Sequence, residues 1–283
     1  MRNLAAVFVF LALALPVSSV GAEGVRAVAS IAPVHSLLAG VMAGVGEPAL
    51  LVRGGRTPHA YVMKPSDARL LKDADVVFWV GPGLEGFLAK PLAGIADKVH
   101  VVQFTDGDRA DQDPHIWLDP RKAANMVRTM ARSLSVADPA NAARYRKNGD
   151  RAVARLVLLE AELQRILAPV AGVPYLVFHD AYGHFQKRFG LSATGAVAVH
   201  ADRPPGARRI SELRRKITAF NIGCVFTEPQ FTPALAKTLI EGTNARLGVL
   251  DPLGAERTPG PGLYPALMRG LAGSLLRCLG ANG

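Results

Sequence analysis

The sequence lacks an interior apolar segment long enough to cross a membrane. Its longest apolar run, residues 5–16, has about 12 residues, whereas a membrane-spanning helix needs roughly 20. This run follows Arg2 and precedes small residues at 20–22, which is the layout of a cleavable signal peptide. No cysteine stands at the cleavage point, so a thioether-linked lipid anchor is not expected. We therefore predict that residues 1–22 are a signal peptide and that the mature protein is soluble and periplasmic.

The sequence also lacks a recognised nucleic-acid-binding motif, although its formal net charge is +10. The basic residues are spread along the chain, as they are on solvated helix faces. An exported protein also meets little nucleic acid. We interpret the charge as a basic surface and predict no binding to nucleic acid.

Cysteine is scarce, with two residues in the chain, Cys224 and Cys278. In an oxidising compartment two cysteines favour one disulfide, which here would join a strand near 224 to the last helix. The alternative is a pair of buried free thiols.

Short apolar or β-branched runs alternate with longer amphipathic segments in both halves of the chain. This alternation is typical of parallel sheets with crossover helices. The strands are predicted at 25–31, 49–52, 76–80 and 99–103 in the first half, and at 175–178, 193–199, 223–227 and 246–250 in the second. The fold class is therefore α/β, with two similar lobes that each hold a four-stranded, mainly parallel sheet flanked by helices.

A single long helix is predicted between the lobes. Residues 139–168 are rich in Ala, Arg, Leu and Glu, with Pro139 in the first turn and Pro169 just past the end. We accordingly divide the chain into an N-terminal lobe at 23–137, a connecting helix at 138–169 and a C-terminal lobe at 170–283. A rigid connecting helix implies limited movement between the lobes.

Three histidines lie where a strand or loop gives way to a helix. His179 directly follows a predicted strand, at the edge where open α/β sheets place their ligands. His59 lies in a Gly-rich turn, His115 precedes a helix start, and Asp251 directly follows the last predicted strand. Three imidazoles and one carboxylate suit Zn²⁺, which prefers four N, O or S ligands. The spacing of these residues alone matches no short metal-binding pattern.

The remaining histidines are interpreted as structural. His35 opens the first helix, His100 lies in a strand pattern, His184 is off the helical face of His179, and His200 follows a strand. Of these four, His200 is the one that could replace Asp251 as the fourth ligand.

Two enzyme classes are alternatives to a binding protein. Residues 81–86 spell G-x-G-x-x-G after a strand, formally a dinucleotide fingerprint, but Pro82 lies inside the turn and the export signal disfavours a nicotinamide enzyme. An exported zinc hydrolase would need an open coordination position and a general base, and the sequence has no H-E-x-x-H. We predict that the protein is not an enzyme.

Several motifs resemble those of a known family when they are taken together and in order. They are PHAYVMKPSDARLLKDADVVFWVGPGLEGFL (58–88), DPHIWLDP (113–120), FHDAYGHFQKRFGL (178–191), FTEPQF (226–231) and DPLG (251–254). The chain resembles the cluster A-I (family 9) metal-binding solute-binding proteins of ABC transporters, and within them the zinc-specific ZnuA branch, from about residue 26 to the C-terminus.

This resemblance implies His59, His115 and His179 as ligands of Zn²⁺ in the cleft between two lobes. It further implies a monomer that delivers zinc to the membrane permease of an ABC importer, which is driven by a cytoplasmic ATPase. Histidine rather than glutamate at 179 distinguishes zinc binders of this family from most manganese binders, since manganese prefers oxygen donors. A manganese or iron carrier of the same fold remains the alternative.

The resemblance also implies Asp251 as the fourth ligand, with water as the alternative. Some zinc-binding members use a glutamate just before the first histidine, but here that position is Pro58. The pairing of Cys224 with Cys278 resembles a bridge of this branch. Many members carry a long His- and acid-rich loop before the second ligand, whereas residues 105–113 hold four aspartates and no histidine.

Ligating histidines usually donate their second N–H to a carboxylate or carbonyl. Glu228 at a strand end and Asp180 beside His179 are the candidates for this role. The alternatives are that Asp180 caps the following helix and that Glu228 faces solvent.

Overall fold

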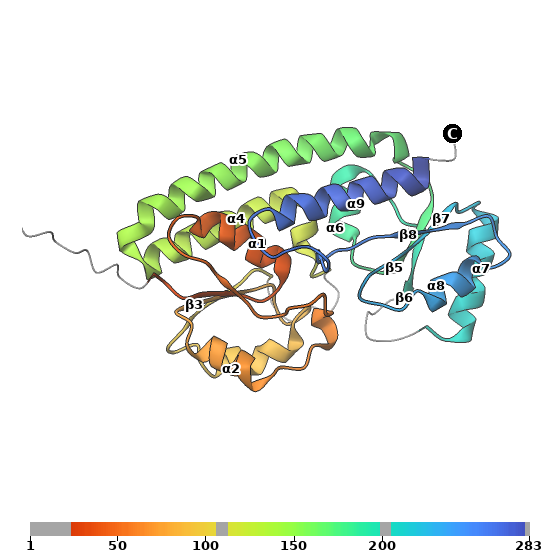
Figure 1. Ribbon diagram of the computed structural model, residues 1–283. Coiled ribbons are helices and arrows are strands. Elements are labelled where there is room, and N and C mark those ends of the chain that lie inside the picture. Colours follow the sequence, from red (N-terminus) through yellow and green to blue (C-terminus); the bar gives the residue numbers. More distant parts are fainter. Residues whose placement is uncertain (1–23, 106–112, 199–204, 281–283) are drawn as a thin grey trace, which may run out of the picture.

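A computed structural model describes residues 24–105, 113–198 and 205–280 (Figure 1). The predicted signal peptide, His200 and most of the aspartate-containing segment 105–113 lie outside the described residues. In the described part of the chain, no helix combines the length and the apolar character needed to span a bilayer.

Both lobes contain a four-stranded sheet in which every strand pair is parallel, as predicted. The strands of the first sheet are β1 (Ala27–Ala29), β2 (Ala49–Leu50), β3 (Val76–Trp79) and β4 (His100–Gln103), in the order β2-β1-β3-β4. Those of the second are β5 (Tyr175–His179), β6 (Gly195–Ala198), β7 (Cys224–Thr227) and β8 (Arg246–Val249), in the equivalent order β6-β5-β7-β8. Strands β3, β5 and β7 are buried along their whole length, because helices cover both faces of a parallel sheet.

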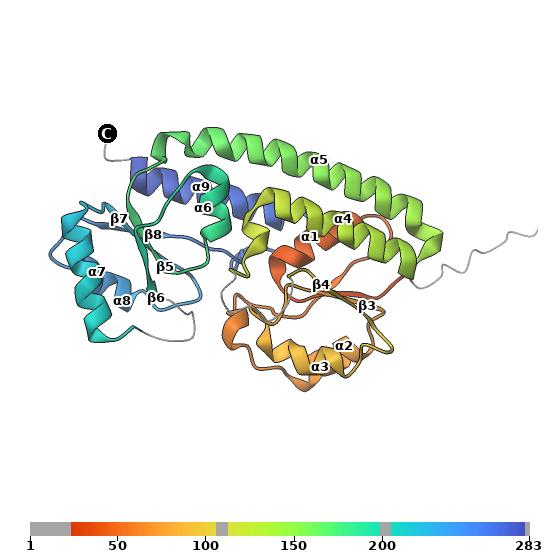
Figure 2. The ribbon, with the colours of Figure 1, turned by 180° about the vertical axis from the view of Figure 1, so that it is seen from behind.

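Nine α-helices are found in the described residues. They are α1 (Ala32–Met42), α2 (Pro65–Lys72), α3 (Ala89–Ala93), α4 (Pro120–Ala137), α5 (Ala142–Leu167), α6 (Gly183–Phe189), α7 (Ala207–Ala219), α8 (Ala234–Ile240) and α9 (Leu263–Leu279). Five 3₁₀ turns complete them: η1 (Pro58–Ala60), η2 (Gly86–Leu88), η3 (Ile116–Leu118), η4 (Pro139–Asn141) and η5 (Ala168–Val170). Figures 1 and 2 show α2 and α3 on one side of the first sheet, and α1 and α4 on the other.

The predicted connecting helix is present as α5, with a 3₁₀ turn at each end. It runs along both lobes and packs on α4, α1 and α9 (Figures 1 and 2). One apolar core continues from Val34 in the first lobe, through Leu159 and Leu163 of α5, to Phe226 in the second. The two lobes therefore share a hydrophobic core, and α5 is not their only connection.

The sequence did not predict that α9 also crosses between the lobes. Its first turn reaches the first lobe, where the Tyr264 backbone N–H donates to Ser36 Oγ at 2.9 Å and the Tyr264 hydroxyl donates to the Trp117 carbonyl at 2.7 Å. Its last turn lies beside the second sheet (Figure 1). Two helices, α5 and α9, thus hold the lobes in place.

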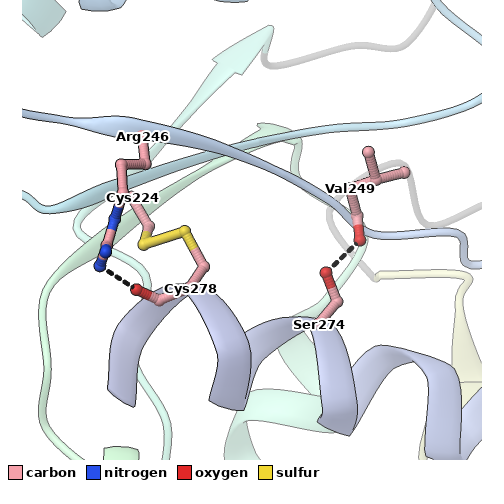
Figure 3. The surroundings of a disulfide bond; sticks show 5 residues. All are labelled: Cys224, Arg246, Val249, Ser274 and Cys278. Atoms are coloured by element: carbon pink, nitrogen blue, oxygen red, sulfur yellow. Dashed lines mark hydrogen bonds between the residues drawn. A yellow bond between two sulfur atoms is a disulfide. The ribbon is translucent and has the colours of Figure 1, made fainter. Parts of the chain in front are cut away.

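The disulfide between Cys224 and Cys278 is present, and the alternative of two free thiols is excluded (Figure 3). It joins β7 to the end of α9, with the two Cα atoms 6.1 Å apart. Two hydrogen bonds support the same junction, from Arg246 Nη2 to the Cys278 carbonyl at 2.6 Å and from Ser274 Oγ to the Val249 carbonyl at 2.5 Å (Figure 3). The end of α9 is therefore tied to the second sheet.

Removing this disulfide is expected to lower the free energy of unfolding by about 4 kcal/mol, since the bridge closes a loop of 54 residues in the unfolded chain. Chemical denaturation of the Cys224→Ser, Cys278→Ser double variant measures the loss. Adding a reductant should destabilise the wild-type protein and leave the variant unchanged. A double variant as stable as the oxidised wild type contradicts the assigned role.

Candidate metal centre

Three imidazoles from three distant segments meet between the lobes. His59 lies in η1, His115 immediately precedes η3, and His179 is the last residue of β5. One ring nitrogen from each lies within 4.8 Å of the other two. The Nε2 atom of His115 is 3.2 Å from that of His59 and 3.4 Å from that of His179.

These separations match the edges of a tetrahedral zinc site. Two nitrogens that each lie about 2.05 Å from a tetrahedral ion are about 3.3 Å apart. A void of about 10 Å³ beside the three rings is lined also by Glu228 and Phe231. It holds about one ion or one water molecule, and it is too small for an organic substrate.

Two carboxylates determine which imidazole nitrogens are free. Glu228, at the end of β7, accepts from His179 Nδ1 at 2.6 Å, and Asp113 accepts from His115 Nδ1 at 2.7 Å. With the N–H of each ring on Nδ1, both Nε2 atoms carry lone pairs and face each other. Such an arrangement is repulsive unless a cation lies between the nitrogens, so the geometry is one that could hold a metal ion.

The electrostatics keep His115 in the neutral form that a metal requires. Burial lowers the pKa of His115, and this effect outweighs the hydrogen bond to Asp113 that raises it. Burial alone would raise the pKa of Asp113, but the hydrogen bonds from His115 lower it below its usual value. The contact is therefore a hydrogen bond from a neutral ring to a carboxylate.

Of the two carboxylates predicted to orient a histidine, Glu228 is buried against His179 and Asp180 is exposed. Glu228 is 2% exposed and holds His179 as described. Asp180 is exposed, and the His179 Nδ1 atom faces Glu228 instead. Asp113 was missed as an orienting residue, although its place two residues before His115 in DPH was a usable signal.

Asp251 lies outside the three-imidazole group. Its Oδ1 accepts from the backbone N–H groups of Leu253 at 3.1 Å and Gly254 at 2.9 Å, and its Oδ2 accepts from that of Ala255 at 2.7 Å. The carboxylate thus caps the turn after β8. Sequence position at a strand end could not reveal this, because the side chain folds back onto its own backbone.

Helix α6 connects the segments that carry His115 and His179. His184 Nε2 lies 2.9 Å from the Asp113 carbonyl, and Arg188 forms a two-pronged ion pair with Asp119 at 2.8 and 2.9 Å. Asp119 also caps α4, four residues after His115. These contacts join α6 of the second lobe to residues of the first lobe on either side of His115 in the sequence.

Of the other histidines, His35 is buried with Nε2 3.0 Å from the Pro48 carbonyl, and His100 is exposed on β4.

In the G-x-G-x-x-G segment, the Glu85 side chain binds the backbone N–H groups that a phosphate would need. Glu85 is fully buried and accepts from the backbone N–H groups of Val80 at 3.1 Å and Gly81 at 2.9 Å. A phosphate would need those donors, so the segment is not a dinucleotide site.

The chain is similar to a known protein family along most of its length. A family model described as "ZnuA: Zinc-uptake complex component A periplasmic" matches residues 27–278. A Brucella abortus protein named High-affinity zinc uptake system protein ZnuA is 38% identical, over 93% of this chain and 94% of its own length. A protein of the same name from Paracoccus denitrificans is 32% identical, over 92% of this chain and 94% of its own length.

Solved structures share the fold. A crystal structure of ZnuA superposes with a TM-score of 0.81 at 24% identity, covering 91% of this chain and all of its own. FpvC from Pseudomonas aeruginosa, solved in complex with Mn²⁺, gives 0.80 at 22% identity and covers 92% of this chain and all of its own. The fold alone therefore does not select the metal.

Replacing Glu228 by alanine is expected to weaken divalent metal binding by about 10- to 100-fold, because His179 loses the partner that fixes its tautomer. Glu228→Gln keeps an acceptor and should lose less. Competition with a chromophoric chelator measures the affinity. Asp180→Ala removes an exposed carboxylate beside the same histidine and serves as the control. Equal losses in Asp180→Ala and Glu228→Ala would show that the assignment of Glu228 is wrong.

Proposed function

Since the chain belongs to the ZnuA family of periplasmic zinc-uptake components, we propose that it is the zinc-binding component of an ABC-type importer. In this proposal it acts in the periplasm as a monomer, after loss of residues 1–22. It captures Zn²⁺ between the lobes with His59, His115 and His179. It then delivers the ion to a membrane permease coupled to a cytoplasmic ATPase.

The arrangement of the imidazoles and their carboxylate partners supports this proposal most directly. The Nε2 lone pairs of His115 and His179 face each other in a buried site, and each ring is held by a carboxylate on its other side. Three converging imidazole nitrogens favour zinc over manganese, which prefers harder oxygen donors. The fold alone does not determine which metal binds, but these nitrogen donors favour zinc.

We propose water as the fourth ligand, because Asp251 lies outside the imidazole group and its carboxylate caps a turn. Zinc with three protein ligands and a water resembles a catalytic site. The adjoining void of about 10 Å³, however, admits no ester or peptide substrate. We therefore propose that the protein binds zinc and catalyses no reaction.

Protein purified without a polyhistidine tag is expected to retain about one equivalent of zinc. The His59→Ala, His115→Ala, His179→Ala triple variant should retain almost none, because no set of three nitrogen donors remains at the site. Elemental analysis after dialysis against a weak chelator measures this difference. His100→Ala, which removes an exposed imidazole on β4, is the matched control. Zinc retained by the triple variant would refute the proposed site, and preferential retention of manganese would favour the other carrier.

Zinc affinity is expected to decrease as pH falls, because protons compete with the metal for the imidazole nitrogens. Burial lowers the pKa of His115, so this ring stays neutral at pH 7 and is protonated only below the ordinary histidine value of about 6.5. The affinity should therefore change little just above neutrality and decline in acid. Isothermal titration between pH 7.5 and 5.5 tests the direction, and a constant affinity over this range would be inconsistent with imidazole ligands.

A further inference from the structure

The turn after β8 is shaped by one carboxylate. Residues 252–255, which directly follow Asp251, are called the 252–255 turn below. Three backbone N–H groups of this turn converge on the two Asp251 oxygens at 2.7 to 3.1 Å. Gly254 adopts φ +73°, and a Cβ there would lie 3.1 Å from the Leu263 side chain. The conformation thus depends on Asp251 as acceptor and on a glycine that permits the backbone to turn.

This turn belongs to the second lobe, but it contacts the first lobe beside two of the proposed ligands. Trp117 Nε1 donates to the Pro252 carbonyl at 2.8 Å in a fully buried contact, two residues after His115. At the other end of the turn, Ala255 lies so close to Gly55 that a Cβ on the glycine would be 2.8 Å from the alanine Cβ. Gly55 precedes His59 by four residues.

The same carboxylate is linked to the third proposed ligand. Gln230 Nε2 donates to Asp251 Oδ1 at 3.3 Å. Gln230 stands two residues after Glu228, which holds the His179 ring. Asp251 is therefore connected, within a few residues, to all three imidazoles without lying among them.

We propose that Asp251 is a positioning residue for the zinc site. Its carboxylate holds the 252–255 turn against the segments that carry His59 and His115, and this contact sets the spacing of those imidazoles relative to His179. The inference rests on the proposed function, and it gives Asp251 a role other than that of the fourth ligand implied by family resemblance.

Buried hydrogen bonds between the lobes explain how such a small turn acts on affinity. The Trp117–Pro252 bond links the first lobe to the segment after β8, whereas the Arg188–Asp119 ion pair links it to α6, which follows β5. If the turn loosens, His59 and His115 are no longer held in place relative to His179. Metal ligands that must be gathered on binding bind more weakly than ligands already in place.

Substituted Co²⁺ distinguishes a positioning residue from a ligand, because its visible absorption bands report the donor atoms while a titration reports the affinity. For Asp251→Ala we expect unchanged band positions and zinc affinity reduced by about 10- to 100-fold. Asp251→Asn keeps one acceptor oxygen for Leu253 and Gly254, so it should restore much of the affinity. A shift of the Co²⁺ bands in Asp251→Ala would identify Asp251 as a ligand, and an unchanged affinity would remove its positioning role; either result overturns the proposal.

A second variant tests the route through the turn. Trp117→Phe removes the donor to Pro252 while keeping most of the ring, and it should weaken zinc binding in the wild-type background. Combined with Asp251→Ala it should add little, because both changes release the same turn. If the double variant loses zinc affinity by the product of the two single losses, the two residues do not act through the same turn. Thermal unfolding of the metal-free variants verifies that each is folded.

Glu256→Ala, which removes an exposed carboxylate just after the turn, is the matched control and should keep wild-type affinity. Failure of the wild-type protein to bind zinc or Co²⁺ would instead refute the proposed function itself. The two failures are therefore distinguishable in one set of titrations.

Discussion

Two hydrogen bonds, a partly buried one from His115 to Asp113 and a buried one from His179 to Glu228, are the interactions on which the site depends. Each carboxylate places the ring N–H on Nδ1 and leaves the Nε2 lone pair directed at the other imidazole. Without these partners the rings could rotate or exchange tautomers, and a proton shared between two Nε2 atoms could satisfy them. With them, a cation is the species that relieves the repulsion.

The rest of the fold keeps these rings at short and fixed distances. His179 comes from one sheet and His115 from a loop of the other lobe, so a small displacement between the lobes would change the separation of their Nε2 atoms from 3.4 Å. The shared core along α5, the crossing of α9 and the Arg188–Asp119 ion pair resist such a displacement. The disulfide secures the end of α9 to the second sheet, so that this helix can bear on both lobes.

Much of the fold could be predicted from the sequence because its signals are local. All eight predicted strands are present, with ends that differ by a few residues, and the prolines at 139 and 169 mark the boundaries of the connecting helix. The packing of α9 on the first lobe could not be predicted, because an amphipathic pattern shows that a face is buried but not which element covers it. The same limit explains why the sequence did not indicate one core shared by both lobes.

For the site, the family resemblance singled out the three histidines that the structure brings together, and strand-end position pointed to Glu228, which contacts His179. These signals were not enough for Asp113, Asp180 and Asp251. Each of these aspartates lies close in sequence to a turn or a histidine, and which group it contacts depends on side-chain direction. Asp251 caps its own turn, Asp180 faces solvent, and Asp113 accepts from His115.

X-ray absorption spectroscopy of the zinc-loaded protein can determine whether three imidazoles bind one ion. We expect four nitrogen or oxygen ligands at about 2.0 to 2.1 Å, with multiple scattering from three imidazoles. A spectrum that fits fewer than three imidazoles would contradict the convergence of His59, His115 and His179 on one ion.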